Sequence, residues 1–224
     1  MTYKSTEDNA QKVFQYMDHN EEYIELVHSG DDYFHRLEKI IEKAQNEIHL
    51  QTYIFENDGT GNRKATCLKE AAQRKMKVYV LLDAYVSAAL PDSFSQDLVY
   101  HGISLWFFSP LFSKNNFYLG RRMHHKIVVA DGKTALVGGI NIADKYHGTP
   151  ASEAWLDYAV QLDCPAAMIC KYCREIIFLT KGAQKKTKPV LHSAGRALMG
   201  ILQNDWLKNK TEVCDAYTNA ILCT

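Results

Sequence analysis

Hydrophobic positions along the chain switch between the period of a helix and the period of a strand. Apolar side chains recur at helical spacing over residues 33–44 and predict a helix with one buried face. Residues 48–55, IHLQTYIF, alternate and are rich in β-branched and aromatic side chains, which is typical of a strand. Residues 57–61, NDGTG, predict a turn or loop, and residues 62–74 predict a second helix. Residues 78–85, VYVLLDAY, are hydrophobic on both faces, as in a central strand of a covered sheet.

The alternation continues through the rest of the chain. The remaining expected elements are a polar-amphipathic helix over residues 3–28, a break and helix cap at residues 30–32, a helix over 92–101, strands over 103–108 and 158–162, a helix over 165–179 and a basic, polar linker over 180–193. Strands that alternate with helices in this way predict an α/β domain, with a mixed sheet packed between helix layers.

A hairpin is the clearest local feature of the sequence. The stretches MHHKIVVA (123–130) and KTALVGGIN (133–141) flank the dipeptide Asp131-Gly132. An Asp-Gly pair supplies the positive φ angles that tight hairpins need. The two stretches are therefore predicted to be antiparallel neighbours.

This hairpin would gather groups that suit a bound phosphate. His124 and Lys126 are two residues apart on a strand, so both project from one face. Folding about the turn brings Gly138, Gly139 and Asn141 opposite them, within a residue of register. A lysine binds anionic oxygens, and a histidine serves as nucleophile or proton carrier. Glycines leave room for a ligand beside the backbone, and the asparagine adds an amide donor.

Other polar residues near the hairpin have different expected roles. Asp131 lies five residues past Lys126, roughly 16 Å along a strand, so it cannot touch the same phosphate and is interpreted as a turn residue that holds the hairpin. Tyr53 and Glu56 sit near the end of an early strand, where such sheets place ligands, and they either line the site or serve as core and turn residues. His125 faces the other way and is expected to be structural.

Composition narrows the choice of partners. Of the 224 residues 46% are hydrophobic and 23% are charged, which is ordinary for a globular protein. Lys plus Arg and Asp plus Glu each number 26, so the formal net charge is zero, and nucleic acid is disfavoured because duplex binding usually brings a strongly basic face. Local basic clusters nevertheless occur at residues 121–126 and 181–188.

The cysteines and the apolar runs point to a cytoplasmic protein. Cys170 and Cys173 form a lone C-x-x-C without a second pair or an obvious nearby histidine, so we expect reduced structural thiols and no metal or other cofactor. The first residues lack the apolar core of a signal peptide, and no apolar run approaches the roughly 18 residues of a spanning helix. Peripheral contact with the inner face of the cell membrane stays open, because the aromatic stretch 107–118 could pack internally or touch a bilayer.

The hairpin residues also resemble a known motif. The spacing His-x-Lys-x4-Asp-x6-Gly-Gly-x-Asn over residues 124–141 is similar to the HKD signature of the phospholipase D superfamily. HLQTYIFENDGTG, FFSPLF, YLGRRMHHKIVVADGKTALVGGINIADKY and Trp155-x-Asp157 resemble the bacterial cardiolipin synthase branch, over residues 30 to about 167. One departure is Cys164, where that branch more often has glycine.

The resemblance implies a fold and a reaction. The fold would be a phospholipase D-like α-β-α sandwich, one half of a usual pair. One histidine would attack phosphorus and form a phosphohistidine, and a second histidine would protonate the leaving alkoxide, without a metal. Lys126 and Asn141 would stabilise charge on the phosphoryl oxygens, and Asp157 matches the position of the carboxylate that holds the nucleophilic histidine.

Only one such motif is present in this sequence. His192 is the other candidate downstream, and it lacks the following lysine. The second histidine would therefore come from a homodimer partner or from a second half that this chain lacks. Residues 202–222 resemble the linker and leading helix of a second half, which favours the latter. The expected organisation is an N-terminal helical segment at 1–29, the phospholipase D-like domain at 30–180, and the linker and leading helix at 181–224 of a truncated protein.

Three functions follow as hypotheses. The first is a cardiolipin synthase-type phosphatidyltransferase, which acts on phosphatidylglycerol-like phospholipids. The second is a single-motif nuclease or phosphodiesterase that works as a homodimer. The third is an inert folded module, which the intact His124, Lys126 and Asn141 argue against.

Overall fold

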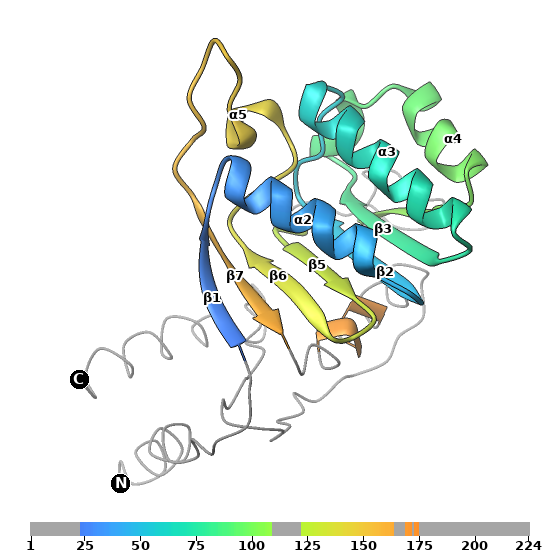
Figure 1. Ribbon diagram of the computed structural model, residues 1–224. Coiled ribbons are helices and arrows are strands. Elements are labelled where there is room, and N and C mark those ends of the chain that lie inside the picture. Colours follow the sequence, from blue (N-terminus) through green and yellow to red (C-terminus); the bar gives the residue numbers. More distant parts are fainter. Residues whose placement is uncertain (1–22, 109–121, 164–168, 172, 175–224) are drawn as a thin grey trace, which may run out of the picture. The chain divides into compact units, whose positions relative to one another are not determined.

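A mixed sheet of seven strands organises residues 23–108, 122–163, 169–171 and 173–174, which are the residues that the computed structural model describes (Figure 1). The strand order is β1-β7-β6-β5-β2-β3-β4. Neighbours β2, β3 and β4 are parallel, and all other pairs are antiparallel. The strands are β1 (Tyr23–His28), β2 (Glu47–Thr52), β3 (Lys77–Asp83), β4 (Ser104–Phe108), β5 (Lys126–Ala130), β6 (Thr134–Gly138) and β7 (Tyr158–Asp163).

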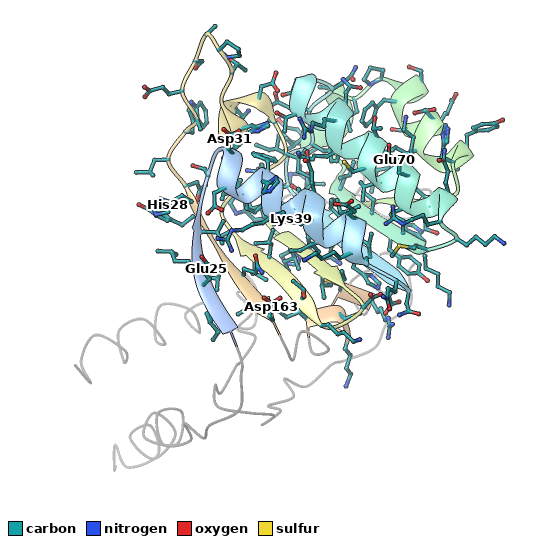
Figure 2. All side chains as sticks on the ribbon, viewed as in Figure 1. Glu25, His28, Asp31, Lys39, Glu70 and Asp163 are labelled. Carbon is teal, nitrogen blue, oxygen red and sulfur yellow. The ribbon has the colours of Figure 1, made fainter. Side chains whose placement is uncertain are left out.

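Amphipathic helices cover one face of this sheet (Figure 1). The helices are α2 (Asp31–Lys43), α3 (Gly59–Gln73), α4 (Asp92–Tyr100) and α5 (Asp144–His147), with a 3-10 turn at Val86–Ala89. Phe34 and Leu37 of α2 are buried against the sheet, whereas Lys39 of α2 and Glu70 of α3 are exposed (Figure 2). Helical residues at 169–171 and 173–174 contact the opposite face, so the predicted sheet between helical layers is confirmed.

The central strands β2 and β3 are buried on both sides, and for β3 its apolar sequence predicts this. In β2, Ile48 and Leu50 belong to the main core beneath the helices, while the alternate residues His49 and Gln51 face the second side and are also buried. In β3, Leu81 packs with Met123 in a separate small cluster on that second side. The expected strand positions agree with the observed ones to within three residues at every end.

The N-terminal boundary differs from the prediction. We expected a helix over residues 3–28, but Tyr23–His28 is the strand β1, which pairs with β7 from Tyr23 opposite Asp163 to His28 opposite Tyr158 (Figure 2). The sheet edge supplies backbone partners, and Val27 is fully buried, so tertiary pairing overrides the local pattern. The domain therefore begins before residue 30, and residues 3–22 lie outside the described part.

The stretch NDGTG was also assigned wrongly as a loop. Helix α3 already begins at Gly59, and the Asp58 side chain caps it by accepting a hydrogen bond from the Gly61 backbone at 2.8 Å. A Cβ at Gly61 would collide with the Glu56 carbonyl, so the glycine serves a close backbone approach rather than a flexible loop.

The hairpin is confirmed. Asp131 and Gly132 have φ angles of 54° and 64°, and Ala130 pairs with Thr134 across the turn. The Asp131 carboxylate accepts hydrogen bonds from the backbone N–H groups of Gln45, Asn46 and Glu47, at 2.7–2.9 Å. It therefore ties the hairpin to the chain entering β2. Burial raises the pKa of Asp131, but these backbone donors outweigh it and the pKa lies below its ordinary value.

Several predicted segments cannot be compared with the structure. The stretch 109–121, the linker over 180–193 and the tail over 202–222 lie outside the described residues, as does most of the helix expected over 165–179. Across the described parts of the chain, no helix is both long and apolar enough to cross a membrane.

We expect Asp131→Ala to lower the free energy of unfolding by about 2–4 kcal/mol, because three backbone donors lose a charged acceptor. Asp131→Asn is the matched control, since asparagine tolerates the positive φ angle but lacks the charge, and it should cost less. The measurement is urea unfolding between pH 3 and pH 7.

The pH dependence has a defined sign. A lowered carboxyl pKa contributes stability that is present above the unfolded-state pKa of about 3.9 and is lost as pH falls through the folded value. The difference between the wild type and Asp131→Asn should therefore shrink at the acid end. A constant difference across this range would show that the carboxylate charge is not what matters.

Candidate active site

Lys126 lies at the centre of the candidate site although its side chain is only 5% exposed. It begins β5 and pairs with Thr52 of β2. Its ammonium donates a hydrogen bond to the His124 carbonyl at 3.0 Å and lies 3.1 Å from the His124 ring nitrogen Nδ1. The Tyr53 ring lies beside both, with its centroid 5.1 Å from the ammonium and 4.7 Å from the His124 ring centroid. The structure thus brings together three of the residues proposed from the sequence.

The end of β6 adds Gly138 and Gly139 to the site, and the residue before β7 adds the Asp157 carboxylate. The hairpin register, carried one residue beyond Ile127–Val137, sets Lys126 opposite Gly138. A Cβ at Gly138 would meet the backbone of β7, and a Cβ at Gly139 would meet the Asp157 carboxylate. The negative charge of Asp157 raises the pKa of Lys126, so the two groups act on each other across this edge. The role of Asp157 in holding the His124 ring stays a prediction.

Asn141 is more deeply embedded than the sequence suggested. Its side chain is 2% exposed, its Oδ1 accepts from the Ile54 backbone at 3.0 Å, and its Nδ2 donates to the Tyr146 hydroxyl at 2.8 Å. It therefore joins the segment after β2 to the segment after β6. An amide nitrogen carries two hydrogens, and the bond to Tyr146 uses one of them. The second amide hydrogen could donate a hydrogen bond to a phosphoryl oxygen.

The electrostatics of the pair favour a neutral imidazole beside an ammonium. Although the His124 side chain reaches solvent, the surrounding protein lowers its pKa, the charge of Lys126 lowers it further, and Asp83 opposes both. Burial lowers the pKa of Lys126 to about 8, against the opposing effect of Asp157. Near neutral pH, the His124 imidazole is therefore neutral and the Lys126 side chain is a cation.

Asp83 is a component of the site that the sequence analysis missed. It is fully buried at the end of β3, where it accepts hydrogen bonds from the backbone of Tyr85 and Val86 and, at 2.8 Å, from the backbone N–H of Met123. It therefore fixes the residue directly before His124. The available signal was an acidic residue closing an otherwise apolar strand, which suggests a buried and partnered carboxylate.

Three other residues lie apart from this cluster. Asp131 closes β5 at the end opposite Lys126, in agreement with its reading as a turn residue. The Glu56 carboxylate forms an ion pair with the Lys145 ammonium of α5 at 2.5 Å. The His125 ring lies 3.1 Å from the Gln51 side-chain oxygen on the second side of the sheet, and burial lowers its pKa to about 4.

The fold and the His124–Lys126 cluster define a phospholipase D-like domain. Residues 37–155, more than half of the chain, match the family described as cardiolipin synthase, PLD-like domain. The chain belongs to this family, and the resemblance seen in the sequence is confirmed.

Individual relatives agree with this assignment. Cardiolipin synthase B of Shigella flexneri is 38% identical over 146 residues, which are 63% of this chain and 35% of that protein. The chain thus spans about a third of the length of the curated relatives it matches. The phosphatidylserine synthase of Haemophilus influenzae Rd KW20 has the same fold, with a TM-score of 0.57 at 15% identity over 78% of this chain and 46% of that one. Nuc of Salmonella typhimurium, a phospholipase D family member, matches with a TM-score of 0.54 at 17% identity over 70% of this chain and 95% of that one.

The contact between Gly139 and Asp157 yields a stability prediction. Gly139→Ala should lower the free energy of unfolding by about 1–3 kcal/mol, because the added methyl would occupy the place of the Asp157 carboxylate. Gly139→Ala in an Asp157→Ala background should cost markedly less. Urea unfolding of the four proteins gives the coupling energy, and additive costs would contradict the contact.

Proposed function

We propose that this chain carries one catalytic half of a phosphatidyltransferase of the cardiolipin synthase type. The observation that supports this best is the buried Lys126 ammonium held against the His124 ring at the edge of the sheet. A cation shielded from water binds an anionic phosphoryl group strongly, and the adjacent neutral imidazole can attack phosphorus. Family membership supports the same chemistry.

The proposed reaction has two displacements. His124 attacks the phosphorus of a phospholipid, the bond to the head-group oxygen breaks, and a phosphohistidine forms. The leaving alkoxide takes a proton from a second histidine. An acceptor alcohol then returns a proton to that histidine, attacks phosphorus and releases His124. Lys126 and the second amide hydrogen of Asn141 would stabilise the charged oxygens in both steps.

The second histidine belongs to a partner site in this proposal. The sequence contains one HKD motif, and the chain spans only part of its relatives. A second phospholipase D-like half or a second copy of the chain would supply the missing group. The substrate would be a phosphatidylglycerol-like lipid, which requires peripheral contact with a membrane, and the proposed location is the cytoplasm at the inner face of the cell membrane.

Transfer of a labelled phosphatidyl group in phosphatidylglycerol vesicles is the direct test. His124→Ala should abolish transfer, Asn141→Ala should weaken it less, and Lys126→Ala should cost roughly 3–4 kcal/mol of transition-state stabilisation. His101→Ala, at the half-buried C-cap of α4, is the matched histidine control and should keep the wild-type rate.

The assay is run over a range of chain concentrations, because a site completed by a second copy gains activity on association. A parallel assay with labelled DNA addresses the alternative function. DNA cleavage without lipid transfer would replace the proposal by a nuclease, and full lipid transfer by His124→Ala would contradict the catalytic role of His124.

The pH profile of transfer follows from the two pKa shifts. The rate should rise as His124 loses its proton, below pH 6.5, and should fall near pH 8 as Lys126 loses its charge. Asp157 raises the pKa of Lys126, so Asp157→Asn should move the alkaline limb to lower pH. An alkaline fall in rate that stays at the same pH in Asp157→Asn, or moves to higher pH, would contradict this effect of Asp157 on Lys126.

A further inference from the structure

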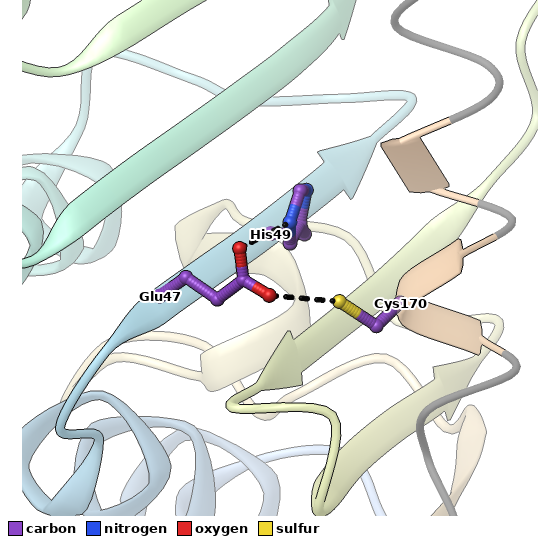
Figure 3. A group of neighbouring side chains, drawn as sticks. All are labelled: Glu47, His49 and Cys170. Atoms are coloured by element: carbon purple, nitrogen blue, oxygen red, sulfur yellow. Dashed lines mark hydrogen bonds and ion pairs between the residues drawn. The ribbon is translucent and has the colours of Figure 1, made fainter.

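A row of polar residues lies on the second side of β2, away from the main core. Glu47 and His49 are alternate residues of this strand and point to the same side, where the helical residue Cys170 packs against them (Figure 3). One ligand atom from each residue lies within 4.8 Å of the others. Carboxylate, imidazole and thiol therefore meet in a place that the proposed transfer reaction does not use.

His49 is the anomaly in this cluster. Its side chain is 1% exposed, and among the described residues neither ring nitrogen has a hydrogen-bond partner. Oε2 of Glu47 is 3.5 Å from Nε2, which is longer than an ordinary hydrogen bond. The ring stacks on Tyr79 with a centroid distance of 4.6 Å, so its direction is fixed by packing. A buried polar ring without partners is costly and calls for an ion or a water.

The Glu47 carboxylate lies next to both other groups, at distances typical of neighbouring ligands of one ion. Bonds of about 2.3 Å to sulfur and about 2.0–2.1 Å to nitrogen and oxygen imply separations of roughly 3.3–3.6 Å between ligand atoms around Zn²⁺. The Cys170 sulfur lies 3.3 Å from Oε1 of Glu47, the His49 nitrogen lies 3.5 Å from the other oxygen, Oε2, and the ligand atoms of all three residues lie within 4.8 Å of one another. Magnesium and calcium prefer oxygen ligands alone, so a mixed set of sulfur, nitrogen and oxygen favours a transition-metal ion such as zinc.

We propose that Glu47, His49 and Cys170 bind one Zn²⁺, with a water molecule in the fourth position. The ion would satisfy the His49 ring and fasten the helical residues 169–171 and 173–174 to β2. The backbone N–H of Asp131 donates a hydrogen bond to the Glu47 carbonyl, and the backbone N–H of Glu47 donates one to the Asp131 carboxylate. The same ion would therefore also stabilise the turn of the hairpin. The role is structural, and it is independent of the proposed transfer chemistry.

Arg174 explains how the cluster is neutralised without the ion. Its guanidinium pairs with Oε1 of Glu47, and its side chain is 58% exposed and can move away. Arg174 should therefore compete with zinc for the Glu47 carboxylate.

Metal binding to the tag-free full chain tests the site, after dialysis against a chelator. Zinc titration by calorimetry should give one ion per chain, and Co²⁺ should produce a thiolate-to-cobalt charge-transfer absorption. Cys170→Ser should remove this absorption, and His49→Gln should weaken zinc binding at least tenfold. The matched controls are Cys67→Ser on α3 and His101→Gln on α4, which should bind as the wild type does.

Arg174→Ala separates a metal site from a simple hydrogen-bonded cluster and does not disturb a buried residue. It should bind zinc more tightly, because a competing cation is removed. Circular dichroism of each metal-free variant reports whether its fold is intact. Absence of zinc binding by the wild type, an unchanged cobalt spectrum in Cys170→Ser, or weaker binding by folded Arg174→Ala would each overturn the proposal.

Discussion

The pairing of β5 against β2 is the constraint on which the candidate site depends. Thr52 opposite Lys126 fixes the antiparallel register, so the residues just beyond this pair, Tyr53 and His124, meet at one sheet edge. A slip of one residue would turn Lys126 to the other side of the sheet. At the far end of β5, Asp131 holds the chain that enters β2 and thereby resists such a slip.

A buried cation also shapes the chemistry of this edge. Desolvating an ammonium is costly, and Lys126 recovers part of that cost from the His124 carbonyl, the Tyr53 ring and the charge of Asp157. The part of the desolvation cost that these groups do not offset lowers the pKa of Lys126 and favours the binding of an anionic ligand. The site is thus electrostatically prepared for an anionic group before one binds.

Local signals were sufficient for most of the elements and for the central pair. The Asp131-Gly132 turn and the two-residue spacing of His124 and Lys126 depend on neighbours in sequence, so periodicity and turn chemistry predicted them. The β1 strand was missed because its partner β7 lies at the other end of the domain. The start of α3 was missed because an Asp-Gly pair signals both a turn and a helix cap.

What the sequence by itself determined is therefore the order of most elements, the hairpin, the family and the candidate pair of His124 and Lys126. The tertiary structure alone decided which carboxylate supports the segment before His124, since Asp83 and Met123 are 40 residues apart. It also decided that the lone C-x-x-C has a histidine beside it, because His49 lies on β2 and Cys170 on a helical segment far along the chain. Contacts over such distances arise from sheet order and helix packing, which no local pattern of hydrophobic and polar residues records.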